Sequence, residues 1–218
     1  MILKQLFALA LFATLPTFAS ASFLVDFENT WDYANGDVNG YYSGLTAADG
    51  SSGANLGVSF VGVSGLSNDS SFTYYSGAPS MLGIAYVFAS SPGDTAFMNV
   101  AAGLDTGLSF FYSSTVPVTG AVKAYSGLNG AGKLLGTFDL AANDPGNSLI
   151  TESKAYTTWT PATFRYSGTA LSFDLTASGT NYVGFDNISS VPEPSFLWLF
   201  GAGLAVFGAI SRRKKVPA

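Results

Sequence analysis

The stretch Ser22-Phe23-Leu24-Val25-Asp26-Phe27-Glu28 decides the fold class of this chain. Apolar side chains occupy every second position, and Leu24, Asp26 and Glu28 stand between them. Side chains point to opposite faces at successive positions of a β-strand. The segment therefore predicts a strand with one apolar face and one carboxylate-bearing face.

Short apolar segments of the same kind recur along the chain, separated by clusters of Gly, Ser, Asn and Thr, and helical periodicity is missing between them. The expected strands are residues 56–63, 81–89, 95–102, 107–113, 118–125, 133–140, 162–166, 170–176 and 181–188. Gly127 to Gly132 is a predicted turn, and Ser167-Gly168-Thr169 is a predicted tight hairpin. About ten strands at this spacing predict an all-β fold, a two-sheet antiparallel sandwich or jelly roll around an aromatic core.

The amino-terminal segment, residues 1–21, is predicted to be a secretory signal peptide. A single positive charge precedes the apolar run Leu6 to Phe18. Ala19 and Ala21 are the small residues that a signal peptidase recognises, so we expect cleavage after Ala21. Residues 22–190 are then long enough to form one extracytoplasmic β-sandwich domain with its own core.

The last 28 residues contain three features in close order. The motif Val191-Pro192-Glu193-Pro194 comes first, and residues 195–211 then carry no charge. The basic end consists of Arg212, Arg213, Lys214 and Lys215. Residues 195–211 would form a helix of roughly 25 Å, at the short end of what spans a bilayer. Because positive charge stays cytoplasmic, the bulk of the chain is expected on the outer side. The alternative is a buried core helix, but such a helix rarely ends on four cations.

The tail as a whole, residues 191–215, resembles the PEP-CTERM sorting signal of Gram-negative envelope proteins, also called the "ice-binding protein C-terminal" domain. The resemblance implies that Pro192, Glu193 and Pro194 are recognised by exosortase, a membrane protease-transpeptidase. It also implies export through the inner membrane, transient anchoring there by the carboxy-terminal helix, and delivery to the cell envelope, the surface or the exterior. Exosortase and signal peptidase are thus the expected partners.

Composition excludes several classes of function. The chain contains neither Cys nor His, which removes disulfides, thiol chemistry, His-ligated zinc and Ser-His-Asp machinery. Residues 22–190 hold 13 acidic and four basic residues, a net charge of −9 that disfavours nucleic acid as a partner. We therefore expect a protein that is not an enzyme. A polysaccharide hydrolase with paired carboxylates is a distant alternative.

Three carboxylates form a candidate metal site. Asp26 and Glu28 lie on one face of the first predicted strand, and Asp186 lies in the last. The first and last strands of such sandwiches often lie side by side, and Ca²⁺ prefers hard oxygen ligands of this kind. The hypothesis is a structural calcium ion, which would be the only cofactor. The alternative is that all three are solvated surface acids.

Aromatic residues in and near the long polar loop 31–54 form a candidate ligand site. The candidates are Trp31, Tyr33, Tyr41 and Tyr42, joined by Tyr74 and Tyr75. Aromatic faces pack against the C–H faces of sugars, although most such rings in a sandwich serve only in packing. Residues 41–60 and 183–188 resemble the galactose-binding or lectin-like jelly rolls of exported bacterial proteins. The expected role is carbohydrate or protein interaction within exopolysaccharide or biofilm matrix, and a ligand-free structural envelope protein is the alternative.

Overall fold

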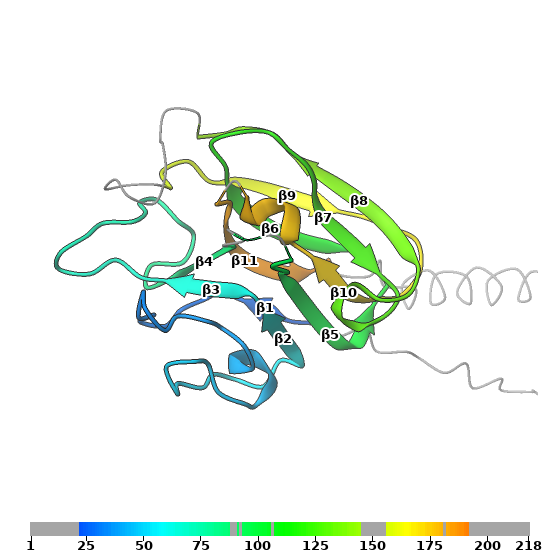
Figure 1. Ribbon diagram of the computed structural model, residues 1–218, viewed down its shortest axis with the longest axis horizontal. Helices are drawn as coiled ribbons and strands as arrows, with labels where there is room; N and C mark the ends of the chain where they lie inside the picture. Colours follow the sequence, from blue (N-terminus) through cyan, green and yellow to red (C-terminus); the bar gives the residue numbers. More distant parts are fainter. Residues whose placement is uncertain are drawn as a thin grey trace, which may run out of the picture.

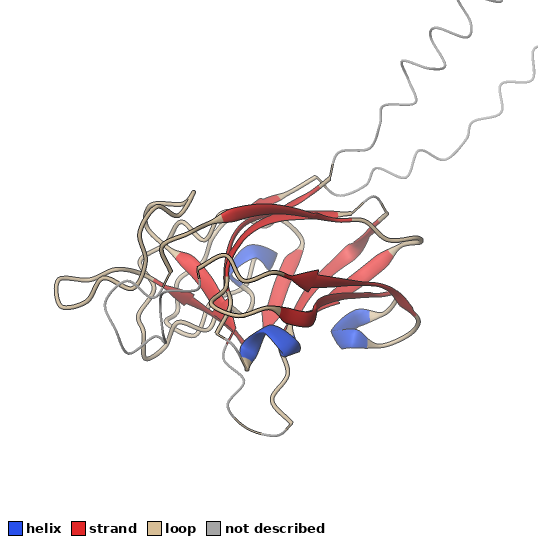
Figure 2. Ribbon diagram, turned by 90° about the horizontal axis from the view of Figure 1, so that it is seen from above, coloured by secondary structure: helices blue, strands red, loops and turns tan. Residues whose placement is uncertain are grey.

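Two antiparallel β-sheets pack face to face in the computed structural model (Figures 1 and 2). The structure describes residues 22–87, 91, 93–105, 107–144, 156–180 and 182–191. The predicted signal peptide with Ala19 and Ala21, and the tail features from Pro192 to Lys215, lie outside these residues. Within the described part, no helix is both long enough and apolar enough to span a membrane.

The strands are short, and most connections between them are loops. Their bounds are β1 (Leu24–Val25), β2 (Val58–Val61), β3 (Val63–Leu66), β4 (Ile84–Val87), β5 (Phe97–Leu104), β6 (Leu108–Ser113), β7 (Val118–Tyr125), β8 (Leu134–Leu140), β9 (Thr160–Phe164), β10 (Ala170–Asp174) and β11 (Gly184–Ser190). The helical turns are η1 (Tyr41–Ser43), η2 (Leu128–Gly130) and α1 (Thr176–Gly179). The predicted all-β class is therefore confirmed for the described residues.

Sheet A has the strand order β3-β4-β11-β6-β9, with β1 added alongside β11, and sheet B has the order β2-β5-β10-β7-β8. The first and last strands pair as expected, with Val25 opposite Ile188. One predicted strand, residues 56–63, divides at Gly62 into β2 of sheet B and β3 of sheet A. Gly62 has a φ of +60° there, a conformation that glycine adopts without the steric cost of a Cβ.

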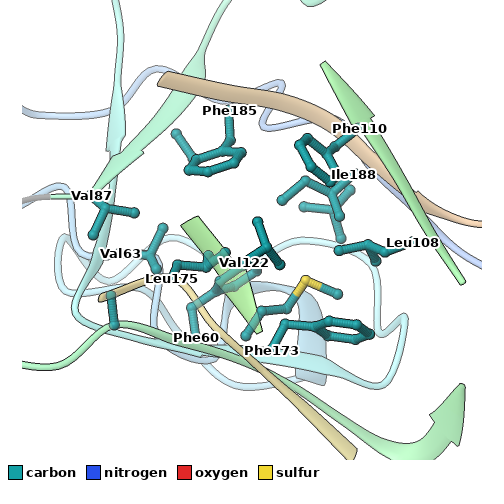
Figure 3. Close-up of a cluster of buried hydrophobic side chains, with 14 of the residues drawn as sticks. Phe60, Val63, Val87, Leu108, Phe110, Val122, Phe173, Leu175, Phe185 and Ile188 are labelled. Carbon is teal, nitrogen blue, oxygen red and sulfur yellow. The ribbon is translucent and has the colours of Figure 1, made fainter. Parts of the chain in front are cut away.

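The main core fills the space between the two sheets (Figure 3). Phe60 and Phe173 project into it from sheet B and face Phe110 and Phe185 of sheet A, and each is at most 3% exposed. The rings of Phe110 and Phe185 meet edge to face, with centroids 5.6 Å apart. Burial of one such side chain contributes about 1.5–3 kcal/mol to the free energy of folding. The aromatic core predicted from the sequence is therefore present.

A second, smaller apolar cluster covers the outer face of sheet A. Val63 of β3 and Val87 of β4 point into the main core. Because side chains alternate between the two faces of a strand, residues 64 and 66 of β3 and residues 84 and 86 of β4 point outward. The buried members of the outer cluster are Leu66, Tyr75, Ile84, Tyr86 and Tyr156. Tyr75 comes from the long segment between β3 and β4, which extends to one end of the sandwich (Figure 1). This outer layer supports the face on which the candidate site lies.

The predicted hairpin at residues 167–169 is wrong. Strand β9 pairs with β6 in sheet A, whereas β10 pairs with β5 and β7 in sheet B. The Ser-Gly-Thr turn thus carries the chain from one sheet to the other. Turn residues permit a sharp reversal, but they do not determine which neighbour each strand will pair with. The last expected strand before Asn181 also ends early, at Asp174, and residues 176–179 form α1.

Candidate functional site

Three of the four aromatic residues predicted to bind ligand are buried. Trp31, Tyr41 and Tyr42 are 3%, 9% and 3% exposed. The rings of Trp31 and Tyr41 pack edge to face 5.0 Å apart, and the indole N–H of Trp31 donates to the carbonyl of Phe27 at 2.9 Å. These rings close one end of the main core, where water is excluded and no ligand can stack on them. The prediction of a platform made by these three residues is wrong.

The fourth candidate, Tyr33, is 54% exposed and belongs to a different aromatic group. Its ring stacks on the ring of Tyr74, with centroids 5.6 Å apart and planes inclined by 6°. Phe72 lies against the same tyrosine, with centroids 4.5 Å apart. We call Tyr33, Phe72 and Tyr74 the aromatic platform. It lies beside β3 and β4 at the outer face of sheet A.

The loop that carries Tyr33 is tied to the edge of sheet A. Asp32 accepts a hydrogen bond from the N–H of Ala34 at 2.9 Å, which closes a tight turn around Tyr33. The chain then runs beside β3, where the N–H of Val38 donates to the carbonyl of Val63 at 3.0 Å. A side-chain bond reinforces this pairing at the next position of β3, where the Ser64 hydroxyl donates to Asp37. Tyr33 is therefore held beside the sheet despite its exposure.

The segment that carries Phe72 and Tyr74 is held by two polar side chains. Asn68 Oδ1 accepts the N–H groups of Tyr74 at 2.7 Å and Tyr75 at 3.1 Å, and Asn68 Nδ2 donates to the carbonyl of Tyr75 at 3.0 Å. Asp69 Oδ1 accepts the N–H groups of Ser71 and Phe72, each at 2.7 Å. The platform is thus built on hydrogen-bonded loops, which lowers the entropy lost when a ligand orders it.

Two carboxylates and the phenol of Tyr86 lie near the platform. Burial raises the pKa of Tyr86 to about 12. The nearby Tyr33 and the charge of Asp37 add to this increase. Burial, followed by the charge of Asp69, raises the pKa of Tyr74. Both phenols are therefore protonated near neutral pH. Tyr86 is buried in the outer cluster, so the polar groups that a ligand on the platform could reach include the exposed carboxylates of Asp37 and Asp69.

The three predicted calcium ligands are each engaged in a different way. Asp186 is fully buried, and its two oxygens accept the N–H groups of Ser80 and Asn187, both at 2.7 Å. Glu28 accepts the N–H groups of Met81 and Leu82. Burial raises the pKa of Asp186 to about 6, against the opposing effect of these hydrogen bonds.

Asp26, the third predicted ligand, accepts the hydroxyl of Tyr42 and the N–H of Glu28, at 3.3 Å and 3.2 Å. No group of three or more acidic side chains in the described ranges is arranged to hold a metal ion. These three carboxylates therefore do not form a cluster of metal ligands among the described residues, and a bound calcium ion stays a prediction. The carboxylates of Glu28 and Asp186 instead fasten the loop 76–83 to the segment after β1 and to β11. Ser80 adds to this attachment by donating to the carbonyl of Asp26.

Several residues of the site were missed by the sequence analysis. They are Asp37, Asn68, Asp69, Phe72 and Tyr86. The polar run 67–71 indicates only a turn, and Tyr86 looks like any aromatic residue of a strand. Sequence spacing alone does not show that these segments meet Tyr33.

The carboxy-terminal stretch was compared with known protein families. A family model described as the PEP-CTERM protein-sorting motif matches residues 190–215. The chain carries a PEP-CTERM sorting signal. Such signals mark exported proteins that are sorted by exosortase and are anchored transiently in the membrane before they reach the cell surface. The predicted sorting signal is therefore confirmed, whereas the membrane helix 195–211, the basic end 212–215 and the recognition of Pro192, Glu193 and Pro194 stay predictions.

Two solved structures resemble the β domain of this PEP-CTERM protein. One is the K1 cleaved adhesin domain of Lys-gingipain from Porphyromonas gingivalis W83, with 13% identity, a TM-score of 0.41, and coverage of 78% of this chain and 99% of that chain. The other is the K3 cleaved adhesin domain of the same protein, with 16% identity, a TM-score of 0.39, and coverage of 78% and 98%. No curated protein matches the sequence.

Proposed function

We propose that this PEP-CTERM protein binds carbohydrate through the aromatic platform, without catalysing a reaction, at the cell surface or within exopolysaccharide matrix. The observation that carries the proposal is the stack of the exposed Tyr33 on the half-buried Tyr74, with the half-buried Phe72 against it. An aromatic ring left 54% exposed gains nothing for folding from its outer face. A sugar ring can use that face through its C–H groups.

The surroundings of the platform suit a sugar better than an entirely apolar ligand. Sugars present hydroxyl groups around an apolar ring face, so a suitable site combines an aromatic surface with a few polar groups at its rim. Here the exposed carboxylates of Asp37 and Asp69 lie beside the segments that carry the rings. The hydrogen bonds of Asn68 hold Tyr74 in place before a ligand arrives.

A non-enzymatic role is supported by composition and by the state of the nearby acids. The chain has no His and no Cys to act as a base or nucleophile near neutral pH. Asp37 accepts the hydroxyl of Ser64 and Asp69 caps a turn, so each has a structural role. A polysaccharide hydrolase remains the distant alternative, and polysaccharide turnover lost on a single Asp→Asn change would favour it.

The test is a glycan array followed by affinity electrophoresis with the best ligand. Tyr33→Ala should weaken binding about tenfold, because stacking on an aromatic ring contributes about 0.5–1.5 kcal/mol. Tyr33→Phe keeps the ring and should retain most of the affinity. Tyr125→Ala, on β7 of sheet B, is the matched control and should bind like the wild type. Failure of the wild type to bind any glycan would favour the ligand-free structural alternative.

A further inference from the structure

We infer that the aromatic platform selects sugars that carry a free amino group, such as glucosamine units, over acidic sugars. The inference rests on the proposed function and adds the class of ligand. Its basis is that the segments that build the platform carry acidic residues but no basic ones. No Lys or Arg occurs between Lys4 and Lys123, and the platform with its supporting loops lies entirely within that interval.

Three carboxylates lie in the segments that build the platform. Asp32 precedes Tyr33 in an exposed turn. Asp37 accepts the hydroxyl of Ser64, which lies opposite Tyr86 in the pairing of β3 with β4, and Asp69 accepts the N–H of the platform residue Phe72. Asp37 and Asp69 each use Oδ1 for their hydrogen bonds, and among the described residues no donor reaches Oδ2 of either.

The basic residues in the described part of the chain lie on other strands than those beside the platform. Lys123 lies on β7 and Lys133 directly precedes β8, both in sheet B. Arg165 follows β9, which forms the edge of sheet A opposite to β3. In the described part of the chain, negative charge beside the platform is therefore not neutralised by a neighbouring Lys or Arg.

An ammonium group fits this combination of rings and carboxylates. A cation over the face of Tyr is attracted by the ring quadrupole, and a carboxylate accepts a charge-assisted hydrogen bond from it. A uronate, sulfate or phosphate group on the same surface would meet like charge without a compensating cation. An N-acetylated sugar keeps the stacking contact but loses the charge. The expected order of affinity is therefore amino sugar, then N-acetyl sugar, then acidic sugar.

The test uses the full-length protein in neutral detergent and three oligosaccharides of equal length: a glucosamine oligomer, its N-acetylated counterpart and a galacturonate oligomer. Calorimetry should show the glucosamine oligomer binding about tenfold more tightly than the N-acetylated one, with no binding of galacturonate. Asp37→Asn and Asp69→Asn should each weaken glucosamine binding roughly two- to fivefold and should weaken N-acetyl binding by a smaller factor. Asn can still accept the hydrogen bonds made by Oδ1 of each.

The exposed Asp105→Asn, after β5 of sheet B, is the matched control and should bind like the wild type. Equal losses in Asp105→Asn and Asp37→Asn would show general attraction to an acidic protein and overturn the inference. Tighter binding of the N-acetylated oligomer, lost in Tyr33→Ala, would overturn the inference while supporting the proposed function. If no sugar binds, both fail. Binding of a lysine peptide alone would indicate a basic protein partner and overturn the choice of a sugar.

Discussion

Asp186 should make the stability of the domain depend on pH in an unusual direction. Its side chain is fully buried on β11, and burial raises its pKa to about 6 from the ordinary value of 3.8. The perturbation is Asp186→Asn, which keeps the shape of the side chain but removes its titration.

The size of the effect depends on the difference between the pKa of Asp186 in the folded state and its pKa in the unfolded state. A shift of about two units corresponds to about 3 kcal/mol, at 1.36 kcal/mol per unit. Between about pH 4 and pH 6, the folded state binds the proton more tightly than the unfolded state does. The contribution of Asp186 is therefore fully present below about pH 4 and is lost as the pH rises through about 6. This is opposite to the usual behaviour of a salt-bridged carboxylate.

The assay is urea denaturation of the wild type and Asp186→Asn between pH 3.5 and pH 7.5. Other acids titrate in both proteins, so the difference between the two unfolding free energies isolates Asp186. Relative to the variant, the wild type should gain about 3 kcal/mol as the pH falls across this range. The loss of one hydrogen-bond acceptor in Asn adds an offset that does not depend on pH. A difference that stays constant across the range would refute the reasoning, and the exposed Asp105→Asn serves as the control.

Two further predictions concern packing and sorting. Gly65→Ala places a Cβ 2.2 Å from a ring atom of Trp31 and should lower the unfolding free energy by about 1–3 kcal/mol. Urea melts would contradict this if the variant were as stable as Thr73→Ala, at an exposed position. Replacing Pro192, Glu193 and Pro194 with alanines should make full-length, membrane-bound protein accumulate, because the motif within residues 190–215 is lost. Cell fractionation and immunoblotting would contradict the sorting role if the size and release of the protein were unchanged.

The features that the sequence determined by itself are local or compositional. Alternation at residues 22–28 predicted a first strand, of which only Leu24–Val25 forms β1, so that Asp26 and Glu28 lie beyond it. Similar segments predicted most other strands, because the two-residue period of a strand is visible in any short window. The sorting signal was likewise recognisable, since its motif, apolar run and basic end come one after another along the chain. The absence of Cys and His is a property of composition and needs no structure.

The features that only the tertiary structure decided depend on contacts between distant segments. Trp31 and Tyr33 are both aromatic and lie in one loop, yet one is 3% and the other 54% exposed. What separates them is whether the ring faces the core or the outer side of sheet A. Likewise, nothing near Asp186 in the sequence shows that the N–H of Ser80 will meet it. Burial and hydrogen-bond partnership are set when the sheets close on each other, so a local pattern can name the candidates for a site but cannot choose among them.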